Sequence, residues 1–223
     1  MTSTLAQLRV RLAARLVDAS NAVFATTTLD EALRTALAEY SAAVPATAET
    51  VLTLPGAGRE IALDGVADLW GVLDVWWPYD SAAPEGWPPP RVAGFRLAWD
   101  DGRPVLVLSQ RLGAQPQAGD ELRLWYTRPH TVQDLDGAAV TSVPPAHATG
   151  LLTGAAGYAA ASQHLNQAGS VRLDPHESGD LSAWAAARLA VFTTWLAALK
   201  TGPGPTGEPY GAGWPMDKWE ARP

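Results

Sequence analysis

The stretch TLDEALRTALAEYSAAVPATAETVLTLPG, residues 28–56, decides the fold because its hydrophobic period changes at Pro45. Before this proline, one apolar residue recurs every three or four positions, as on the buried face of an amphipathic helix: Leu29, Leu33, Leu37 and Tyr40. After it come short apolar and β-branched runs that end at the turn signal Pro55-Gly56. A proline cannot occupy a helix interior without breaking it. The chain therefore passes from helix to strand at Pro45.

The residues before this stretch predict one further amphipathic helix. Its apolar stripe comprises Leu5, Leu8, Leu12 and Leu16, and its other sides carry mostly Arg9, Arg11 and Arg15. The segment DASNAVFATT, residues 18–27, interrupts the helical pattern. We expect the second helix to begin at Thr28, whose side chain caps the backbone while Glu31 completes a capping box.

The middle third of the chain predicts an antiparallel β unit of about five to six strands. Two short strands flank a Pro-Gly turn in residues 49–65, and an aromatic-rich strand follows in residues 69–80. The dipeptide Asp101-Gly102 between apolar residues is the strongest hairpin signal in the chain. One further strand is expected in residues 119–130.

Helical patterns return after this unit. Residues 144–167 are rich in small side chains, so other backbones can pack closely against them. Residues 181–200 predict a final helix, which Gly202 ends. The polar segment between the two helices, residues 173–180, is expected to be mobile.

The predicted fold class is therefore α+β. It consists of a four-helix bundle-like domain (residues 1–45 and 144–201), an antiparallel β subdomain inserted between helices 2 and 3 (residues 46–143) and an extended C-terminal arm (residues 202–223). Five glycines and five prolines exclude a helix or a central strand in the arm, which nevertheless displays Tyr210, Trp214 and Trp219. Fully extended, the arm spans up to roughly 70 Å. Docking on a partner, packing on its own domain and disorder are the alternatives, and we favour docking.

Composition excludes several classes of protein. The net charge of −7 disfavours a protein that grips phosphate through an overall basic surface. The chain has no cysteine, which removes disulfides, thiolate zinc sites and cysteine nucleophiles. The arginine-containing N-terminus does not have the pattern of a signal peptide, and we expect no segment to approach the roughly 20 apolar residues of a membrane span. A soluble protein without an export signal is expected.

The sequence predicts no catalytic residue, no metal site and no cofactor site. The four histidines, at positions 130, 147, 164 and 176, lack the spacing that aims two ligands of one helix at a metal. The run Gly-Ala-Ala-Gly at residues 154–157 follows no strand, which excludes a dinucleotide-binding loop. The acidic pairs in residues 99–102 and 134–137 are better explained as turns than as acid–base or calcium sites.

Two groups of residues are candidates for contacts with other protein chains. Arg9, Arg11 and Arg15 form either a solvated or salt-bridged helix face, which is the more frequent case, or a contact for the acidic surface of a partner, which we favour over DNA. Trp76 and Trp77 are most simply core aromatics of the β unit, and we also retain them as candidate inter-subunit or partner contacts. Stacking of such tryptophans on sugar rings is the remaining alternative.

Two motifs and the helical segment after them match one known family. In residues 24–41, the pattern of an early helix is met at Leu29, Ala32, Leu33, Ala36, Leu37, Tyr40 and Ser41. In residues 122–152, a Tyr-Thr-x-x-His strand end, an acidic turn and a Val-Pro-x-x-His helix entry are met at Tyr126, Thr127, His130, Asp134, Leu135, Val143, Pro144 and His147. In these features the chain resembles the head–tail adaptor, or connector, proteins of long-tailed bacteriophages. The arm and much of the β insertion match no motif of that family.

The resemblance implies a non-enzymatic structural protein of the virion neck, assembled in the host cytoplasm, with no membrane partner. Such proteins form a homo-oligomeric ring, usually dodecameric, that extends the DNA channel without binding DNA specifically. The ring binds the portal protein above and a stopper or tail-terminator protein below. Because the C-terminal segment of the family commonly reaches into the portal, the resemblance implies a portal-binding arm with Tyr210, Trp214, Pro215 and Trp219.

Two other function classes stay open. The first is a carbohydrate- or surface-binding module that uses exposed tryptophans: Trp76, Trp77, Trp87 and Trp99. The second is an enzyme whose site the motifs do not reveal. The helical bundle with an insertion favours the adaptor, since carbohydrate-binding modules are usually all-β.

Overall fold

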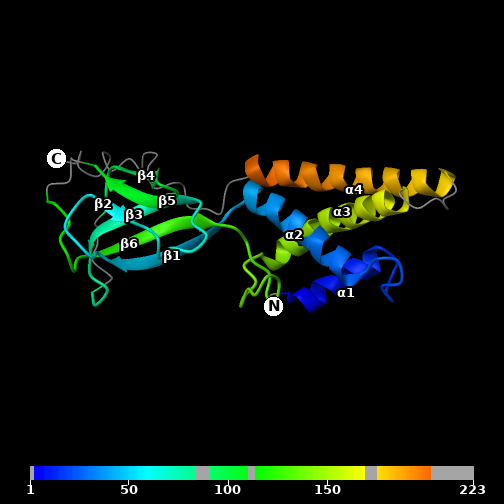
Figure 1. Ribbon diagram of the computed structural model, residues 1–223, viewed down its shortest axis with the longest axis horizontal. Coiled ribbons are helices and arrows are strands. Elements are labelled where there is room, and N and C mark those ends of the chain that lie inside the picture. Colours follow the sequence, from blue (N-terminus) through cyan, green and yellow to red (C-terminus); the bar gives the residue numbers. More distant parts are fainter. Residues whose placement is uncertain (1–2, 84–90, 110–113, 169–174, 202–223) are drawn as a thin grey trace, which may run out of the picture. The chain divides into compact units, whose positions relative to one another are not determined.

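The computed structural model describes residues 3–83, 91–109, 114–168 and 175–201 (Figure 1). Its helices are α1 (Leu5–Arg15), α2 (Thr26–Ala43), α3 (Ala148–Ala168) and α4 (Pro175–Thr201), with a 3-10 turn (Pro145–His147) before α3. Its strands are β1 (Ala46–Thr53), β2 (Glu60–Ala62), β3 (Gly71–Tyr79), β4 (Phe95–Asp100), β5 (Arg103–Leu108) and β6 (Glu121–Arg128). The predicted α+β class is confirmed, because two small sheets are inserted between α2 and α3.

The described chain forms two compact units. The helical unit takes the chain up to Ala46 and resumes at Pro129, and the β unit covers Thr47–Arg128. Each unit has its own cluster of buried apolar side chains.

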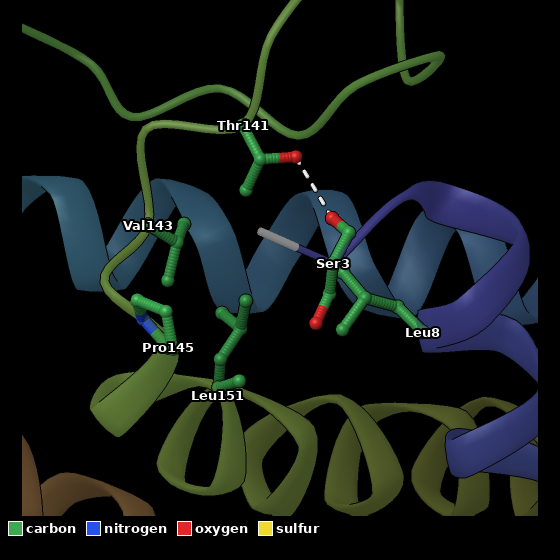
Figure 2. Close-up of a pocket in the computed structure, with 7 residues that line it drawn as sticks. Ser3, Leu8, Thr141, Val143, Pro145 and Leu151 are labelled. Atoms are coloured by element: carbon green, nitrogen blue, oxygen red, sulfur yellow. Dashed lines mark hydrogen bonds between the residues drawn. The ribbon is translucent and has the colours of Figure 1, made fainter. Parts of the chain in front are cut away.

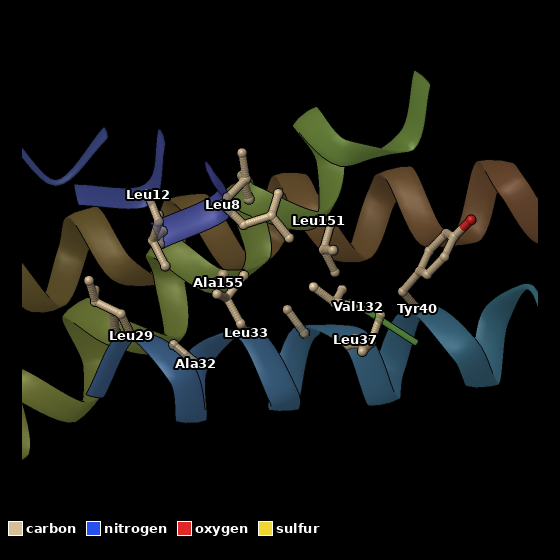
Figure 3. Close-up of a cluster of buried hydrophobic side chains, with 14 of the residues drawn as sticks. Leu8, Leu12, Leu29, Ala32, Leu33, Leu37, Tyr40, Val132, Leu151 and Ala155 are labelled. Atoms are coloured by element: carbon tan, nitrogen blue, oxygen red, sulfur yellow. The ribbon is translucent and has the colours of Figure 1, made fainter. Parts of the chain in front are cut away.

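α3 is the central helix of the helical unit, since it packs against α1, α2 and α4. Figure 3 shows Leu8 and Leu12 of α1 and Leu33 of α2 gathered around Ala155 of α3. Burying one large apolar side chain contributes roughly 1.5–3 kcal/mol. The apolar stripes predicted on the first two helices are thus confirmed as the core of this unit.

Two glycines of α3 mark where α4 lies closest. A Cβ atom added at Gly154 would lie 2.7 Å from the ring of Phe192. A Cβ atom added at Gly150 would lie 2.5 Å from the ring of Trp195. Real Cβ atoms do not approach other atoms so closely, so glycine is what lets these aromatic side chains of α4 lie on α3. The small-residue segment is therefore occupied by a helix of the same chain.

The β unit consists of two three-stranded sheets with strand orders β1–β6–β3 and β2–β5–β4. The predicted turn joins β4 and β5, with Asp101 and Gly102 at φ 46° and 79°. β1 and β2 lie in different sheets, although the sequence placed them on either side of one turn. The reason is the shared core, in which Leu54 and Ile61 pack together with residues of both sheets.

The capping of the second helix differs from the prediction. α2 begins at Thr26 after Ala25, without a side-chain cap, so the capping box expected at Thr28 is wrong. Glu31 pairs with Arg34 at 2.5 Å instead. A capping box is present at Thr4, which bonds reciprocally with Gln7 at the start of α1.

The loop before α2 explains why this helix begins early. The Asp18 carboxylate accepts hydrogen bonds from the backbone N–H groups of Ala22, Val23 and Phe24 at 2.8, 2.9 and 2.8 Å. These bonds, that of Phe24 first, hold the pKa of Asp18 below its ordinary value. They also fix the loop so that Phe24 reaches the core.

α4 is longer and more apolar than expected. It begins at Pro175, so residues 175–180, expected to be mobile, are helical. Proline suits the first helical position, where its missing N–H is not needed. By length and composition alone, the stretch Asp180–Thr201 is also long and apolar enough to cross a membrane. Its mean hydropathy is 1.2, and 17% of it is buried inside the structure. The expectation that no segment approaches such a length is wrong, because the many alanines of α4 raise its mean hydropathy.

Candidate functional site

The predicted portal-binding arm, with Tyr210, Trp214, Pro215 and Trp219, lies outside the described residues. Three other groups of side chains lie within the described residues. One holds motif residues of the helical unit, one holds two of the predicted arginines, and one lies on a sheet of the β unit.

Residues of both family-like motifs meet where the chain leaves and re-enters the helical unit. We call this group the junction cluster; it comprises Tyr40, Ser41, His130, Ser142, His147 and Trp195. The Tyr40 hydroxyl lies 2.6 Å from Nδ1 of His147, which is 107 positions away in sequence. The backbone N–H of His130 donates to Ser41 Oγ at 2.9 Å. The fold thus brings two distant motifs into direct contact.

Ring contacts complete the junction cluster. The Tyr40 ring lies 4.8 Å from the ring of His130 and is stacked on Trp195 of α4 at 5.6 Å. Burial raises the pKa of Tyr40 to about 12, so its hydroxyl stays protonated near neutral pH. A phenol with such a pKa is poorly matched to general acid–base catalysis at that pH. The cluster therefore has the chemistry of a packed structural joint.

Hydroxyl groups fix the segment after β6 to the helical unit. Ser142 Oγ lies 3.0 Å from Nδ1 of His130, and Thr141 donates to the backbone oxygen of Ser3 at 2.8 Å. Figure 2 shows this second bond beside a cavity of about 10 Å³, also lined by Leu8 and Leu151. That volume holds at most about one water molecule. The cavity is too small for a ligand.

The acidic pair in residues 134–137 forms a turn, as predicted. Asp134 and Asp136 have φ angles of 70° and 53°. Asp136 pairs with Arg34 of α2 at 2.7 Å. The carboxylate thus anchors the turn to the helical unit.

The described residues contain no group of three histidine, aspartate or glutamate side chains that could hold a metal ion. His130 and His147 both contact Tyr40, which their spacing in the sequence did not indicate. The second motif of the resemblance contains both histidines and the first contains Tyr40, so the two motifs were the signal that could have placed these three residues together. His164 lies on α3, and the side chain of His176 is outside the description.

The three predicted arginines of α1 have different surroundings. Arg9 forms two hydrogen bonds with the carboxylate of Asp30 in α2, at 2.7 and 2.6 Å. Arg9 is therefore salt-bridged within its own chain, as one alternative for this helix face predicts. Its contact with a partner stays a prediction. Arg15 donates to the hydroxyl of Thr153 at 2.9 Å, and Arg11 is exposed without an ion pair to any described residue.

Arg15 lines a pocket that the sequence did not predict. We call it the arginine pocket; its lining comprises Arg15, Thr153, Ala156, Trp184 and Arg188, and it encloses about 80 Å³. The Arg188 guanidinium lies 5.0 Å from the centre of the Trp184 ring. Burial, and after it the charges of Arg11 and Arg188, lower the pKa of Arg15. Positive charge from α1 and α4 thus converges at this pocket.

The sheet β1–β6–β3 carries an aromatic cluster around one arginine. We call it the aromatic sheet face; it comprises Trp76, Tyr79, Arg123 and Trp125. The Arg123 guanidinium lies 4.4 Å from the centre of the Trp125 ring and 5.4 Å from those of Trp76 and Tyr79. Glu49 of β1 pairs with Arg123 at 2.6 Å. Leu122 and Leu124 alternate with these residues and point into the core, so the aromatic cluster faces the other side.

The other tryptophans divide between core and surface. Trp77 is buried, with 8% of its surface exposed, and its ring N–H donates to Asp120 at 3.2 Å. The interpretation of Trp77 as a core aromatic of the β unit is thus confirmed, and its contact with a partner stays a prediction. Trp70 and Trp99 are exposed at 46% and 59%. Trp87 lies outside the described residues.

No protein-family model matches the sequence, and the comparison with curated proteins gives no match. Among solved structures, the chain is similar to a chain in "Neck of empty GTA particle computed with C6 symmetry", at 20% identity and covering 79% of this chain and 87% of that one. It is also similar to a chain in "Virion of native gene transfer agent (GTA) particle", at 18% identity with 82% and 88% covered. A chain in "Neck of native GTA particle computed with C12 symmetry" has 20% identity, with 82% and 92% covered. The TM-score is 0.30 in all three cases, so function is argued below from this chain's own residues.

Proposed function

We propose that this chain is a structural head–tail adaptor of a tailed-phage virion, with no catalytic activity. It forms a ring beneath the portal, extends the DNA channel and docks the next neck or tail protein. The observation that carries this proposal is the junction cluster, in which Tyr40, His130 and His147 are in contact. These residues belong to two motifs of the adaptor resemblance. If the two motifs resembled the family only by chance, their residues would not be expected to contact each other.

The joint has a clear role in a protein with an inserted unit. Ser41 lies near the end of α2, and His130 follows directly after the β unit. The hydrogen bond between them holds the outgoing and returning segments together. A β unit attached in this way can engage one partner while the helices engage another.

Two surfaces suit the partners of an adaptor. Trp, Tyr and Arg are the residues that most often dominate protein interfaces, and the aromatic sheet face consists of them. We assign that face to the stopper or tail-terminator protein. The arm, with Tyr210, Trp214, Pro215 and Trp219, is assigned to the portal because a proline-rich segment loses less entropy when it becomes ordered.

α4 offers a surface for the ring itself. On its side away from α3, Ala187 and Ala190 are exposed and Val191 is exposed at 58%, and no described residue covers them. Contiguous exposed apolar surface marks an interaction site in soluble proteins. A neighbouring copy covers this side of α4 in the proposed ring. The net charge of −7 repels phosphate, which suits a channel that DNA passes without specific binding.

Exposed Trp70 and Trp99 favour a second candidate, a carbohydrate- or surface-binding module. Sugar stacking needs an open ring face. The rings of Trp76 and Trp125 lie 4.3 Å apart and Arg123 lies over both, so these two tryptophans of the sheet are already in contact with side chains of their own chain. This candidate predicts a monomer whose tryptophan fluorescence is quenched by a polysaccharide.

Co-sedimentation with the portal ring from the same genome tests the adaptor proposal. The full-length chain is compared with a chain that ends at Leu199 and with the full-length variant Tyr210→Ala/Trp214→Ala/Trp219→Ala. We expect the full-length chain to sediment with the portal and both altered chains to be lost. Binding of all three chains would keep the adaptor and remove the arm as its clamp. Binding of none, with an intact portal, would contradict the proposal.

A further inference from the structure

The arginine pocket holds positive charge that no carboxylate of the described chain neutralises. Arg15 bonds there to the neutral hydroxyl of Thr153, and Arg188 lies over the Trp184 ring. Arg11 is exposed, close enough to lower the pKa of Arg15. Three cations without a described counter-charge are unexpected in a chain of net charge −7.

The pocket has the size and the chemistry for a carboxylate. Its volume of about 80 Å³ exceeds the roughly 10–15 Å³ that one water molecule requires. Guanidinium groups bind carboxylates through paired, charge-assisted hydrogen bonds. A carboxylate that enters also relieves the repulsion between Arg15 and Arg188. Trp184 provides an apolar wall beside the charges.

The tip of the β4–β5 hairpin has the complementary chemistry. Asp100 and Asp101 are exposed there, and Trp99 beside them is exposed at 59%. No ion pair joins either carboxylate to a described residue, including Arg103, which lies opposite Asp100 in register. The turn is fixed by left-handed backbone at Asp101. The tip therefore presents two negative charges and one large ring on a defined backbone.

We propose that the β4–β5 hairpin tip of one copy of this chain binds in the arginine pocket of the neighbouring copy. Asp100 and Asp101 pair with Arg11, Arg15 and Arg188, while Trp99 lies against the apolar side of α4. The contact joins two different surfaces, so it repeats from copy to copy and closes when the rotation permits a ring. The proposal rests on the ring of the proposed function and names the surfaces that build it.

A second copy fits this pocket better than DNA does. A nucleic acid is bound along many phosphates, which needs a long basic stripe. The pocket is instead concave, and its lining includes Ala156 and Trp184, which carry no charge that could bind a phosphate. An apolar flank suits Trp99 of a neighbouring chain. DNA binding is therefore treated as a contradicting outcome.

Charge reversal tests the contact with surface changes only. One variant carries Asp100→Lys and Asp101→Lys, and the other carries Arg11→Glu and Arg188→Glu; all four positions are exposed. Alone, each variant places like charges against each other, and we expect at least a tenfold loss of ring assembly on portal rings. In an equal mixture the two variants can alternate around the ring. The lysine tip of one variant then meets the glutamate pocket of the other, and the aspartate tip of the second meets the arginine pocket of the first. We therefore expect assembly to return. Unchanged melting temperatures show that both variants are folded.

The outcomes separate this contact from the proposed function. If both variants assemble like the wild-type chain, the contact is wrong and the adaptor stands. If assembly is lost and the mixture does not restore it, the pairing of hairpin and pocket is wrong. If the wild-type chain does not bind the portal, the proposed function fails together with the ring on which the contact rests.

Disulfide cross-linking gives an independent test, because the chain has no cysteine of its own. A disulfide requires Cα atoms about 4.4–6.8 Å apart. The double variant Asp101→Cys/Arg188→Cys is expected to give a ladder of oligomers on the portal under oxidising conditions, whereas each single variant gives at most dimers. A cross-linked monomer, or no ladder, would overturn the proposal. A third outcome would assign the pocket to phosphate instead. In that case the chain binds duplex DNA, the Arg11→Glu/Arg188→Glu variant does not, and the cysteine variant gives no ladder.

Discussion

At the scale of single residues, the hydroxyls of Tyr40 and Tyr158 form side-chain hydrogen bonds in different surroundings. Tyr40 bonds with His147 in a partly buried cluster, and Tyr158 donates to Glu39 at the surface. Tyr40→Phe is expected to lower the free energy of unfolding by about 1–2 kcal/mol, because it leaves a partly buried ring nitrogen without this partner. Tyr158→Phe should change it by less than about 0.5 kcal/mol, since water replaces the lost partner. Urea denaturation of both variants measures the difference, and equal effects would contradict a structural role of the junction cluster.

Asp18 makes stability depend on pH in the acid range. Its pKa lies below the ordinary value of 3.8 in the folded chain, chiefly because the Phe24 N–H bonds to the carboxylate. The folded state therefore favours the charged form, and this contribution is complete above the unfolded pKa and is lost as pH falls through the folded one. We expect Asp18→Asn to be less stable at neutral pH and to lose less stability on acidification. A melting-temperature series from pH 7 to about pH 2 compares the two chains, and parallel curves would contradict this role.

At the scale of elements, the contact of α3 with α4 depends on glycine. In Gly154→Ala, the new methyl group would meet the Phe192 ring, and overpacking of this kind costs about 1–3 kcal/mol. The better helix propensity of alanine offsets up to about 1 kcal/mol of that loss. We therefore expect a net decrease in stability. Gly56→Ala is the matched control, because a Cβ atom there meets nothing within 4 Å, and it should not destabilise the chain.

On the aromatic sheet face, two interactions of Arg123 differ in strength. Its stacking on Trp125 and Trp76 is partly buried, whereas its ion-pair partner Glu49 has 55% of its side chain exposed. Arg123→Ala is expected to cost about 1–2 kcal/mol through lost cation–π contact and packing. Glu49→Ala should cost less than about 1 kcal/mol, as exposed ion pairs do. Chemical denaturation followed by tryptophan fluorescence measures the free energy of unfolding of both variants. A larger loss in Glu49→Ala than in Arg123→Ala would contradict this prediction.

The sequence predicted those elements well that depend on residues close to one another in the chain. The stripe from Leu29 to Tyr40 and the Asp101-Gly102 turn are local signals, and both are confirmed. The start of α2 was wrong because Asp18, eight positions upstream of Thr26, fixes the loop through backbone bonds. No pattern within the helix itself reports such a bond.

The sites were harder to predict than the fold. Arg9 and Trp77 were sound candidates by residue type, but Asp30 pairs with the first and the core of the β unit encloses the second. The arginine pocket needs Arg15 and Arg188 from helices distant in sequence, and no spacing rule connects them. Such sites follow from packing between elements.

At the scale of the whole molecule, the account is one of assembly. The described chain offers a cationic pocket, a carboxylate-bearing hairpin tip, an uncovered apolar side of α4 and an aromatic sheet face. None of the described surfaces brings catalytic groups together at a ligand-sized cavity. All of them have the composition of protein contacts. Their number is greater than a single pairwise complex requires, and the proposed ring between two partners would use each of them.

Electron microscopy of the portal ring from the same genome, incubated with the full-length chain, tests the central claim most directly. The account predicts a closed ring of this chain on one end of the portal, coaxial with it, with an open channel through both. The β units should occupy the same position in every copy of the ring. A portal that stays bare at saturating concentrations of folded chain, or one that binds scattered single copies without a closed ring, would contradict the account.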